Sequence, residues 1–344
     1  ASAVQTFVNR YSVKLGNNLV LFTNNDSVYP YVQDLKKAKI NILAIVDSRK
    51  NIADSVLADA QNVRVISNSI IKNVIGYKKV NSVVVQSLED KKLETISCDL
   101  LAHSGGWNPM VHLHSQSRGT VKFDDRIAAF VPDHSVQASI NIGACNGTFP
   151  LNEIFDETKS LLSGASENSK SLVYEGKLEC GKQNYSIEAL WSVDLLKENN
   201  KALLAIQNDV THDDMQLALR EGYSNVEHVK RYTTGGMGFD QGKTGNINII
   251  GVIAKEQGIR LDDVGTTTFR SPFTPVSFGS INGVREGSVA LPFRHTPVTK
   301  WNLDKGAFMY EAGARWRRPG YFPMAGEGFQ EAVNRECPAV RTGV

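Results

Sequence analysis

A glycine-rich stretch, EHVKRYTTGGMGFDQGKTGN at residues 227–246, carries residue types that cradle phosphates or hold metals. A phosphate-binding P-loop needs the spacing Gly-x4-Gly-Lys-Thr between a strand and a helix, so that backbone N–H groups face the phosphate. Gly242, Lys243 and Thr244 match the end of this pattern, but Met237 occupies the position of its first glycine. Because the preceding residues also follow a helical pattern, the stretch is not interpreted as a P-loop.

The same stretch resembles part of a small helical 2Fe–2S domain of the bacterioferritin-associated ferredoxin type, whose frame KR-x-T-x-x-GMG-x-C-Q-G it keeps. Asp240 replaces the cysteine of that frame, and Gln207 and Asp209 stand where other ligands are expected. Since such clusters are held by thiolates, we predict no cluster here and a scaffold or interface role for the loop. Two alternatives stay open: an anion docked on the backbone N–H groups of the loop, and plain turn chemistry.

Residues 19–46 have the pattern of a strand, a helix and a second strand. Apolar runs at residues 19–22 and 40–46 predict the strands, and the spacing of Val32 and Leu35 predicts the helix between them. Such a βαβ unit predicts an α/β domain of the nucleotide-binding kind. Further short apolar runs fit a mixed sheet that continues to about residue 145, at residues 63–66, 83–85 and 100–101.

The turn of this βαβ unit departs from the dinucleotide fingerprint. The pattern Gly-x-Gly-x-x-Gly would fall on residues 23–28, TNNDSV, which contain no glycine. Asp26 would repel a pyrophosphate, whereas Asp47 stands where a ribose-binding carboxylate belongs. We therefore expect a Rossmann-like unit that has lost nucleotide binding at this turn or keeps it only weakly.

Three histidines lie in the stretch HSGGWNPMVHLHSQ. On a strand, His112 and His114 would share one face, and His103 would be the third ligand of a zinc ion. No carboxylate or thiol stands at a matching spacing, so ordinary hydrogen-bonded histidines are the preferred interpretation. We predict no metal site, and no Ser-His-Asp triad or carboxylate pair identifies catalytic residues.

Composition and charge limit the class of protein. The 344 residues, 41% of them hydrophobic, suffice for two or three domains, because single cores stop growing at about 250 residues. The 38 basic and 36 acidic residues give a net charge of +2 without a sustained charged run, so we expect neither nucleic acid nor a membrane surface as partner. Four isolated cysteines and no apolar run of about 20 residues predict a soluble, cytoplasmic protein.

Small and polar residues at 160–171, SLLSGASENSKS, predict a linker because they cannot bury apolar area. Residues 265–297 mix prolines with β-branched residues and predict an extended tie between domains. Cys180 and the pair Trp301 and Trp316 are interpreted as packing residues. Since the chain begins without methionine and stops within a periodic pattern, we expect a piece of a longer protein.

A small helical module is predicted between these two segments, over residues 207–258. Its signals are two N-cap residues followed three positions later by a carboxylate, a glycine after each of two helices, and an apolar helical run. The two caps are Thr211 with Asp214 and Ser224 with Glu227. The two helices span residues 212–221, before Gly222, and residues 247–257, before Gly258.

Four stretches together are specific: TNNDSVY, CDLLAHSGGWNPMVHLHSQ, QNDVTHDDMQLALREGYSNVEHVKRYTTGGMGFDQGKTGN and GTTTFRSPFTPVSFG. In this order and spacing, they resemble the alpha subunits of heterotetrameric sarcosine oxidases over essentially the whole chain. The resemblance implies that residues 1–160 are the later part of an FAD/NAD(P)-type oxidoreductase domain. It further implies a helical ferredoxin-like domain without a cluster at 171–260, and at 261–344 a linker and the start of a folate-binding aminomethyltransferase-like domain.

The resemblance also implies an activity and its cofactors. Sarcosine is oxidised to an imine, oxygen receives the electrons as hydrogen peroxide, and tetrahydrofolate takes up the one-carbon unit, which otherwise leaves as formaldehyde. NAD and folate belong to the large subunit, FAD to a partner subunit and FMN to the region near their interface. The implied partners are beta, gamma and delta subunits, and this piece is not expected to catalyse the reaction alone.

One cofactor contact is implied within this chain. The stretch NIGACNGTFPLNEIF at residues 141–155 resembles the segment by which such folds return to the first dinucleotide domain. By that resemblance, Gly143, Ala144, Phe149 and Leu151 contact NAD, and the alternative is an ordinary strand-to-helix turn. Farther along the chain, a histidine of aminomethyltransferases is replaced by Asn302, which leaves the folate side unresolved.

Other functions share parts of this pattern. A related amine or opine oxidase, or a proline dehydrogenase complex, would have the same frame with another substrate. A folate-dependent aminomethyltransferase would lack redox chemistry, and a non-catalytic assembly subunit would leave the turnover of its partners unchanged.

Overall fold

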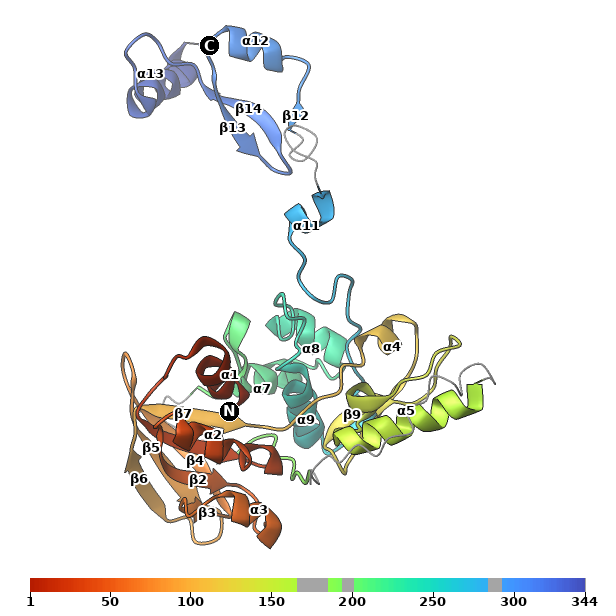
Figure 1. Cartoon of the computed structure of the whole chain (residues 1–344). Helices are drawn as coiled ribbons and strands as arrows, with labels where there is room; N and C mark the ends of the chain where they lie inside the picture. Colours follow the sequence, from red (N-terminus) through yellow and green to blue (C-terminus); the bar gives the residue numbers. More distant parts are fainter. Residues whose placement is uncertain (166–184, 194–200, 284–292, 344) are drawn as a thin grey trace. The chain divides into compact units, whose positions relative to one another are not determined.

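The structure, a computed structural model of the 344-residue chain, describes residues 1–165, 185–193, 201–283 and 293–343. The chain divides into two units, Ala1–Thr274 and Pro275–Val344 (Figure 1). The first unit combines parallel strands with helices, which confirms the predicted α/β class. Among the described residues, no helix has both the length and the apolar character needed to cross a membrane.

A parallel sheet forms the centre of the first unit. Its four strands have the order β3-β2-β1-β7. Their bounds are β1 Asn18–Thr23, β2 Asn41–Asp47, β3 Val65–Ile66 and β7 Leu100–Ser104. The strands at residues 19–22 and 40–46 are therefore confirmed, and helix α2 (Tyr31–Lys37) lies between them in the chain as predicted.

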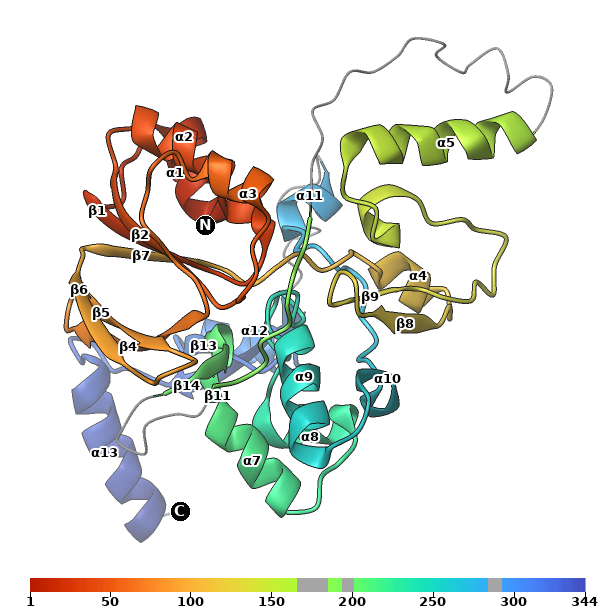
Figure 2. The same ribbon diagram turned by 90° about the horizontal axis from the view of Figure 1, so that it is seen from below.

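The parallel sheet lies between helices on one face and a second sheet on the other (Figure 2), and alternate residues of β1 face these two layers. Leu19 and Leu21 pack with side chains of three helices, whereas Val20 packs against a second sheet. This follows from the two-residue period of a strand in a sheet that is covered on both faces. The three helices are α1 (Ser2–Tyr11), α2 and α3 (Asp54–Asp59).

The second sheet corrects the prediction of one mixed sheet. Strands β4 (Ser69–Gly76), β5 (Val80–Ser87) and β6 (Leu93–Ser97) pair antiparallel with one another in the order β4-β5-β6. Val83 and Val85 on β5 point into the core that they share with Val20. Short hairpin connections keep these three strands together, so their apolar residues cover the parallel sheet instead of extending it.

The next segment differs from the expected pattern at one helix. Residues 112–116 form helix α4 (His112–Gln116), so the strand face that the disfavoured zinc alternative needed for His112 and His114 is not formed. Pro109, just before it, cannot donate to a strand ladder, and HLHSQ contains no β-branched residue. Strands β8 (Val121–Asp124) and β9 (Ala129–Pro132) then form a hairpin.

Helix α5 (Leu151–Ala165) follows the short 3-10 helix η2 (Gly143–Asn146). It continues through residues 160–165, so the linker predicted to begin at Ser160 is wrong there, because Leu161 and Leu162 extend its apolar face. Residues 166–171 of that linker, and Cys180, lie outside the described residues.

The predicted helical module is present within residues 201–264 (Figure 2). Thr211 and Asp214 form a reciprocal capping box at the start of its first long helix, as predicted. The second cap is Asn225 and not Ser224, since the Asn225 side chain accepts the N–H of Glu227. The module comprises strands β10 (Leu203–Ala205) and β11 (Val210–Thr211), the 3-10 helix η3 (Ile206–Asn208), and helices α7 (His212–Arg220), α8 (Val226–Thr233), α9 (Asn246–Gln257) and α10 (Leu261–Val264).

Helix α9 is the core of this module. Its residues Ile249, Ile250 and Val252 are buried, and the helix ends at Gly258 in the left-handed conformation, as predicted. Glycine adopts that conformation without the steric cost of a side chain.

The second unit has a three-stranded sheet of order β12-β14-β13. The side chains of Trp301 and Trp316 are 58% and 37% exposed, and each packs at the surface of this unit, Trp301 edge-on against Phe322 and Trp316 under Arg294. Asn302, by contrast, is buried. The described elements are α11 (Phe278–Asn282), β12 (Arg294–His295), α12 (Thr299–Asp304), β13 (Phe308–Ala312), β14 (Trp316–Tyr321) and α13 (Phe329–Thr342).

A buried ion cluster closes the turn that follows β1. Arg49 donates two hydrogen bonds to Asp47, from Nε to Oδ1 at 3.0 Å and from Nη2 to Oδ2 at 2.8 Å. Its Nη1 donates to Oδ1 of Asp26 at 2.6 Å. The Tyr29 hydroxyl donates to Asp47 at 2.8 Å, and burial together with the Asp47 charge raises the pKa of Tyr29, which keeps it a donor. All three charged side chains are buried.

Residues 185–193, which we name the covering segment, lie along the same turn. The Ser186 carbonyl accepts the N–H of Asp26 at 3.1 Å, and the Ser186 N–H donates to Asp26 Oδ2 at 2.8 Å. The Glu188 N–H donates to the Asn24 carbonyl at 3.0 Å, and Asn24 Nδ2 donates to the Glu188 carbonyl at 2.9 Å. The covering segment therefore pairs with the turn much as an added strand would.

The other end of the covering segment packs on helix α9. The indole of Trp191 lies directly against Gly251, where any side chain would overlap it. Lys255, one helical turn later, donates from Nζ to Ser192 Oγ at 2.7 Å. The covering segment thus joins the parallel sheet to the helical module.

We expect Thr211→Ala to lower the free energy of unfolding of the first unit by about 1 kcal/mol, because it removes one half of the capping box. Urea unfolding followed by far-UV circular dichroism measures this. Asp213→Ala is the matched control, since its exposed carboxylate lies in the same helical turn without capping it. Equal losses for both variants would contradict the role of the cap.

We expect Arg49→Gln to cost about 3–5 kcal/mol of stability, because two buried carboxylates would lose their cation. Arg64→Gln is the control, since the Arg64–Glu94 pair is about half exposed and such pairs contribute about 1 kcal/mol or less. Urea unfolding compares the two variants. A loss for Arg49→Gln no larger than that for Arg64→Gln would show that the cluster does not hold the turn.

Candidate functional site

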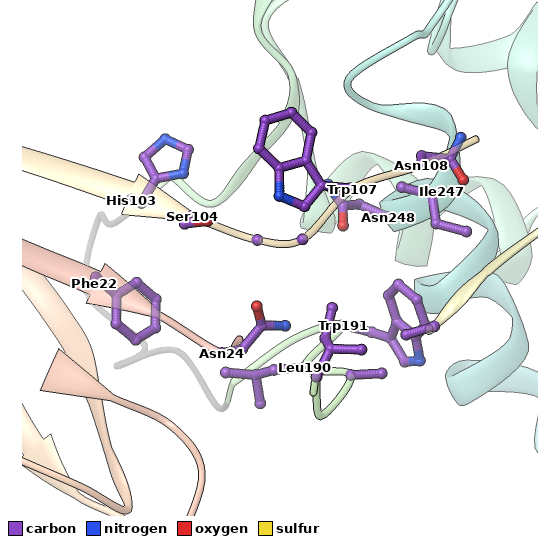
Figure 3. Close-up of a pocket in the computed structure, with 15 residues that line it drawn as sticks. Phe22, Asn24, His103, Ser104, Trp107, Asn108, Leu190, Trp191, Ile247 and Asn248 are labelled. Carbon is purple, nitrogen blue, oxygen red and sulfur yellow. The ribbon is translucent and has the colours of Figure 1, made fainter. Parts of the chain in front are cut away.

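A pocket lies at the carboxyl ends of β1 and β7 (Figure 3). From β1 the chain passes through α2 to β2 on one side, while β7 pairs with β1 on the other side. The sheet therefore changes its direction of winding between these two strands. In open α/β sheets, ligands bind at the carboxyl ends of the strands at such a switch point.

Five parts of the first unit build the pocket walls. They are the end of β1, the loop after β7, Ala128 of the β8–β9 hairpin, the covering segment and the start of α9. Figure 3 shows the chain from His103 to Trp107 along one side and Asn24 on the opposite side. The cavity volume is about 190 Å³, smaller than the roughly 300–1,000 Å³ of pockets that enclose drug-sized ligands, so it has room for a small group.

The lining is mainly apolar with a few neutral polar groups. Phe22, Trp107 and Trp191 supply aromatic rings, and Asn108 and Asn248 supply amides. None of the described residues that line it is Lys, Arg, Asp or Glu. Desolvation lowers the pKa of His103 at the rim, so its ring is neutral at pH 7. The pocket is therefore suited to uncharged ligands.

The turn where a Rossmann fold holds a pyrophosphate is already occupied. The Asp26 N–H donates to Ser186, the Ser27 N–H donates to Asn25 Oδ1 at 3.0 Å, and Pro30 has no N–H to offer. These groups would otherwise face the phosphate. Lost or weak nucleotide binding at this turn stays a prediction, and these internal hydrogen bonds favour it.

Asp47 stands at the position of a ribose-binding carboxylate, but its side chain has other partners. Its side chain is completely buried and accepts hydrogen bonds from Arg49 and Tyr29. The position matches a ribose-binding carboxylate, but the arginine two residues later takes both carboxylate oxygens. The sequence pattern alone does not show this pairing.

The four residues predicted to contact NAD lie around η2 and the start of α5. Gly143 is buried with φ +66°, and its N–H donates to Glu157 Oε2 at 2.8 Å. Ala144 and Leu151 have exposed side chains. The ring of Phe149 packs edge-on against Tyr185, with 5.1 Å between the centroids.

These residues lie outside the pocket lining, but one of them touches a residue that supports it. The Tyr185 hydroxyl accepts the N–H of Trp107 at 3.1 Å. Phe149 therefore contacts the pocket wall through Tyr185. Whether the four residues contact NAD stays a prediction.

The glycine-rich stretch at 227–246 is internally satisfied. Asp240 accepts the Gly242 N–H on Oδ1 at 3.0 Å and the Thr244 hydroxyl on Oδ2 at 3.3 Å, so its carboxylate takes the place of an external anion. The Lys243 ammonium lies 4.1 Å from the centroid of the Phe273 ring. The alternative of an anion docked on this loop is therefore not favoured.

The loop also holds the following segment, in keeping with the predicted scaffold role. Gln241 donates from Nε2 to the Arg270 carbonyl at 2.8 Å, and its Oε1 accepts the Arg270 N–H at 2.7 Å. Asn246 Nδ2 donates to Thr267 Oγ1 at 2.8 Å. Side-chain amides thus bind residues 267–270 to the start of α9.

The histidines are placed separately. His114 is buried, with 2.7 Å from Nε2 to the Thr120 carbonyl and 3.1 Å from Nδ1 to Asn141 Nδ2, as expected for a hydrogen-bonded histidine. His112 stacks on Phe273, and desolvation together with Lys243 lowers its pKa. Within the described ranges, no three His, Cys, Asp or Glu side chains gather as a metal site.

Sequence reasoning missed the pocket itself. Its loop was recognised only through the pattern HSGGWNPM, and Trp191 lies in a stretch with no motif. The available signal was the pair Gly105 and Gly106 directly after a strand, since glycines there allow close approach to a backbone.

Comparison with known proteins places this geometry in context. Residues 199–284 match the family model of the sarcosine oxidase A3 domain. Over the whole chain, the sequence is 36% identical to sarcosine oxidase subunit alpha of Corynebacterium sp. (strain P-1), and over 99% of it 36% identical to that of Rhizobium meliloti (strain 1021). The chain spans 37% and 34% of the length of these two relatives.

Among solved structures, L-proline dehydrogenase from P. horikoshii is similar in fold. It superimposes on 80% of this chain and 52% of its own chain with a TM-score of 0.51 at 18% sequence identity. That identity supports the α/β fold and no more. The resemblance indicated by the residue patterns is confirmed by the sequence comparisons: along its whole length the chain is similar to sarcosine oxidase alpha subunits, and residues 199–284 match the A3 domain.

Proposed function

We propose that this chain is part of the alpha subunit of a heterotetrameric sarcosine oxidase. The observation that carries the proposal is the 36% identity to two alpha subunits over 99–100% of the chain. In this reaction the N-methyl group of sarcosine is oxidised to an imine, and oxygen is reduced to hydrogen peroxide. The one-carbon unit passes to tetrahydrofolate as 5,10-methylenetetrahydrofolate or leaves as formaldehyde, and glycine remains.

The proposal assigns cofactors to the subunits of a cytoplasmic complex. The alpha subunit holds NAD and tetrahydrofolate, and a partner subunit holds FAD, with FMN near the interface between them. Beta, gamma and delta subunits are the partners. The covered turn after β1 supports this division, because it leaves the NAD site to another part of the subunit.

Three parts of the chain contribute to the proposed subunit. Residues 1–160 are the later part of the FAD/NAD(P)-type domain, and 171–260 are the ferredoxin-like helical domain without a cluster. Residues 261–344 are the linker and the beginning of the folate-binding, aminomethyltransferase-like domain. The short helices and capping box of α7 to α9 support the second assignment.

Gly143, Ala144, Phe149 and Leu151 are proposed to line one side of the NAD site. The turn fits a close backbone approach, because Gly143 has a left-handed conformation and Glu157 holds its N–H in place. The exposed side chains of Ala144 and Leu151 are available to a cofactor. When bound, NAD supplies a dinucleotide redox centre, and these residues orient it.

The complete subunit, tagged and purified with its natural partners, is expected to release one hydrogen peroxide per sarcosine consumed. A peroxidase-coupled dye assay measures this, and added tetrahydrofolate should lower free formaldehyde without changing peroxide. Turnover of L-proline or an opine but not of sarcosine would assign a related amine oxidase. Methylene transfer to tetrahydrofolate without release of peroxide would identify the protein as an aminomethyltransferase. If the partner subunits still oxidised sarcosine without this subunit, its role would be assembly alone.

Ala144→Leu in the complete subunit is expected to lower bound NAD about tenfold, which corresponds to about 1.4 kcal/mol of binding energy. The larger side chain would occupy the space that the cofactor needs. NAD released by acid is measured by enzymatic cycling. Ala138→Leu, an exposed alanine in the preceding loop, is the control. Equal NAD content in both variants would show that η2 does not contact NAD.

A further inference from the structure

The pocket between β1, β7 and the covering segment is lined by aromatic rings and side-chain amides (Figure 3). Phe22, Trp107 and Trp191 line it with aromatic rings, and aromatic rings stack on planar heterocycles. Asn108 and Asn248 present amides, each of which both donates and accepts hydrogen bonds. Heteroaromatic rings have apolar faces and polar edges, so they complement both kinds of group.

The same site has no place for a phosphate. The N–H groups of Asp26 and Ser27 are already bonded to Ser186 and Asn25. No Lys or Arg belongs to the described lining, and phosphates in proteins are held by such cations or by free backbone N–H groups. The pocket therefore has space for a ring, whereas the N–H groups of Asp26 and Ser27 that would bind a phosphate are already hydrogen-bonded within the protein.

The loop after β7 gives a ring access to the protein backbone. A methyl group added at Gly105 would meet nothing within 4 Å, so this residue borders open space. Gly106 has φ +104°, and a side chain there would collide with Ile187 of the covering segment. The two glycines thus have different roles. The absence of a side chain at Gly106 allows the covering segment to approach the loop, and Gly105 borders open space.

We propose that this pocket binds a planar heteroaromatic ring that is presented without a phosphate group. The covering segment forms one side of the site and the loop from Ser104 to Asn108 forms the other. The inference does not depend on sarcosine oxidation, because every residue that it uses lies in the first unit of this chain.

The test uses two pairs of probes that differ only in phosphate, riboflavin with FMN and adenosine with AMP. Equilibrium dialysis against the 344-residue chain measures each dissociation constant. At least one unphosphorylated probe is expected to bind saturably at one site per chain, and its phosphorylated form at least tenfold more weakly. Absence of saturable binding by both riboflavin and adenosine would overturn the proposal, as would tighter binding of the phosphorylated form.

Two variants locate the binding. Trp107→Ala is expected to weaken binding about tenfold or more, since stacking on an aromatic side chain contributes about 1–3 kcal/mol per ring. Gly105→Leu should weaken it similarly by filling the open space. Trp301→Ala, an exposed tryptophan of the second unit, is the control. Far-UV circular dichroism confirms that each variant is folded, and unchanged affinity in both pocket variants would overturn the proposal.

Discussion

The docking of residues 185–193 on the turn after β1 determines what the first unit is able to bind. A Rossmann-like turn normally offers backbone N–H groups to a pyrophosphate. Here Ser186 takes the N–H of Asp26 and returns its own N–H to the Asp26 carboxylate. Arg49 joins both partners, because Nη1 donates to Asp26 and, at 3.0 Å, to the Ser186 carbonyl. The turn is thus held by hydrogen bonds to one buried cation, Arg49.

The same docking creates the pocket beside the turn. The covering segment continues from Ser186 to Trp191, whose indole packs on Gly251 of α9. It therefore spans from the parallel sheet to the helical module, and the space it leaves at the ends of β1 and β7 is the pocket. The glycine-rich loop before α9 also links separate segments of the first unit. Its Gln241 side chain forms two hydrogen bonds with the backbone of Arg270.

Local features of the fold could be predicted from the sequence. Apolar runs identified β1 and β2, and the pair Thr211 and Asp214 identified the start of α7, because strand burial and helix capping depend on neighbouring residues. Four specific stretches indicated the similarity to sarcosine oxidase alpha subunits, and the curated relatives confirmed it. The absent glycines in TNNDSV indicated weak or lost nucleotide binding at this turn.

Long-range pairing could not be predicted. Asp26 and Ser186 are 160 residues apart, and nothing in the local pattern of either shows that they meet. Asp47 has the position of a ribose-binding residue, but its contacts are decided by Arg49 and Tyr29. The sequence analysis predicted one mixed sheet, whereas β4 to β6 form a separate antiparallel sheet. A short apolar run indicates a strand but not the strand with which it pairs.

Hydrogen exchange of single amides tests the central claim most directly. Followed by NMR or fragmentation mass spectrometry, the amides of Asp26, Ser186 and Glu188 should exchange as slowly as those within β1, because all three are hydrogen-bonded between the turn and the covering segment. Rapid exchange of these three amides, with β1 still protected, would show that the covering segment does not hold the turn and would contradict the account.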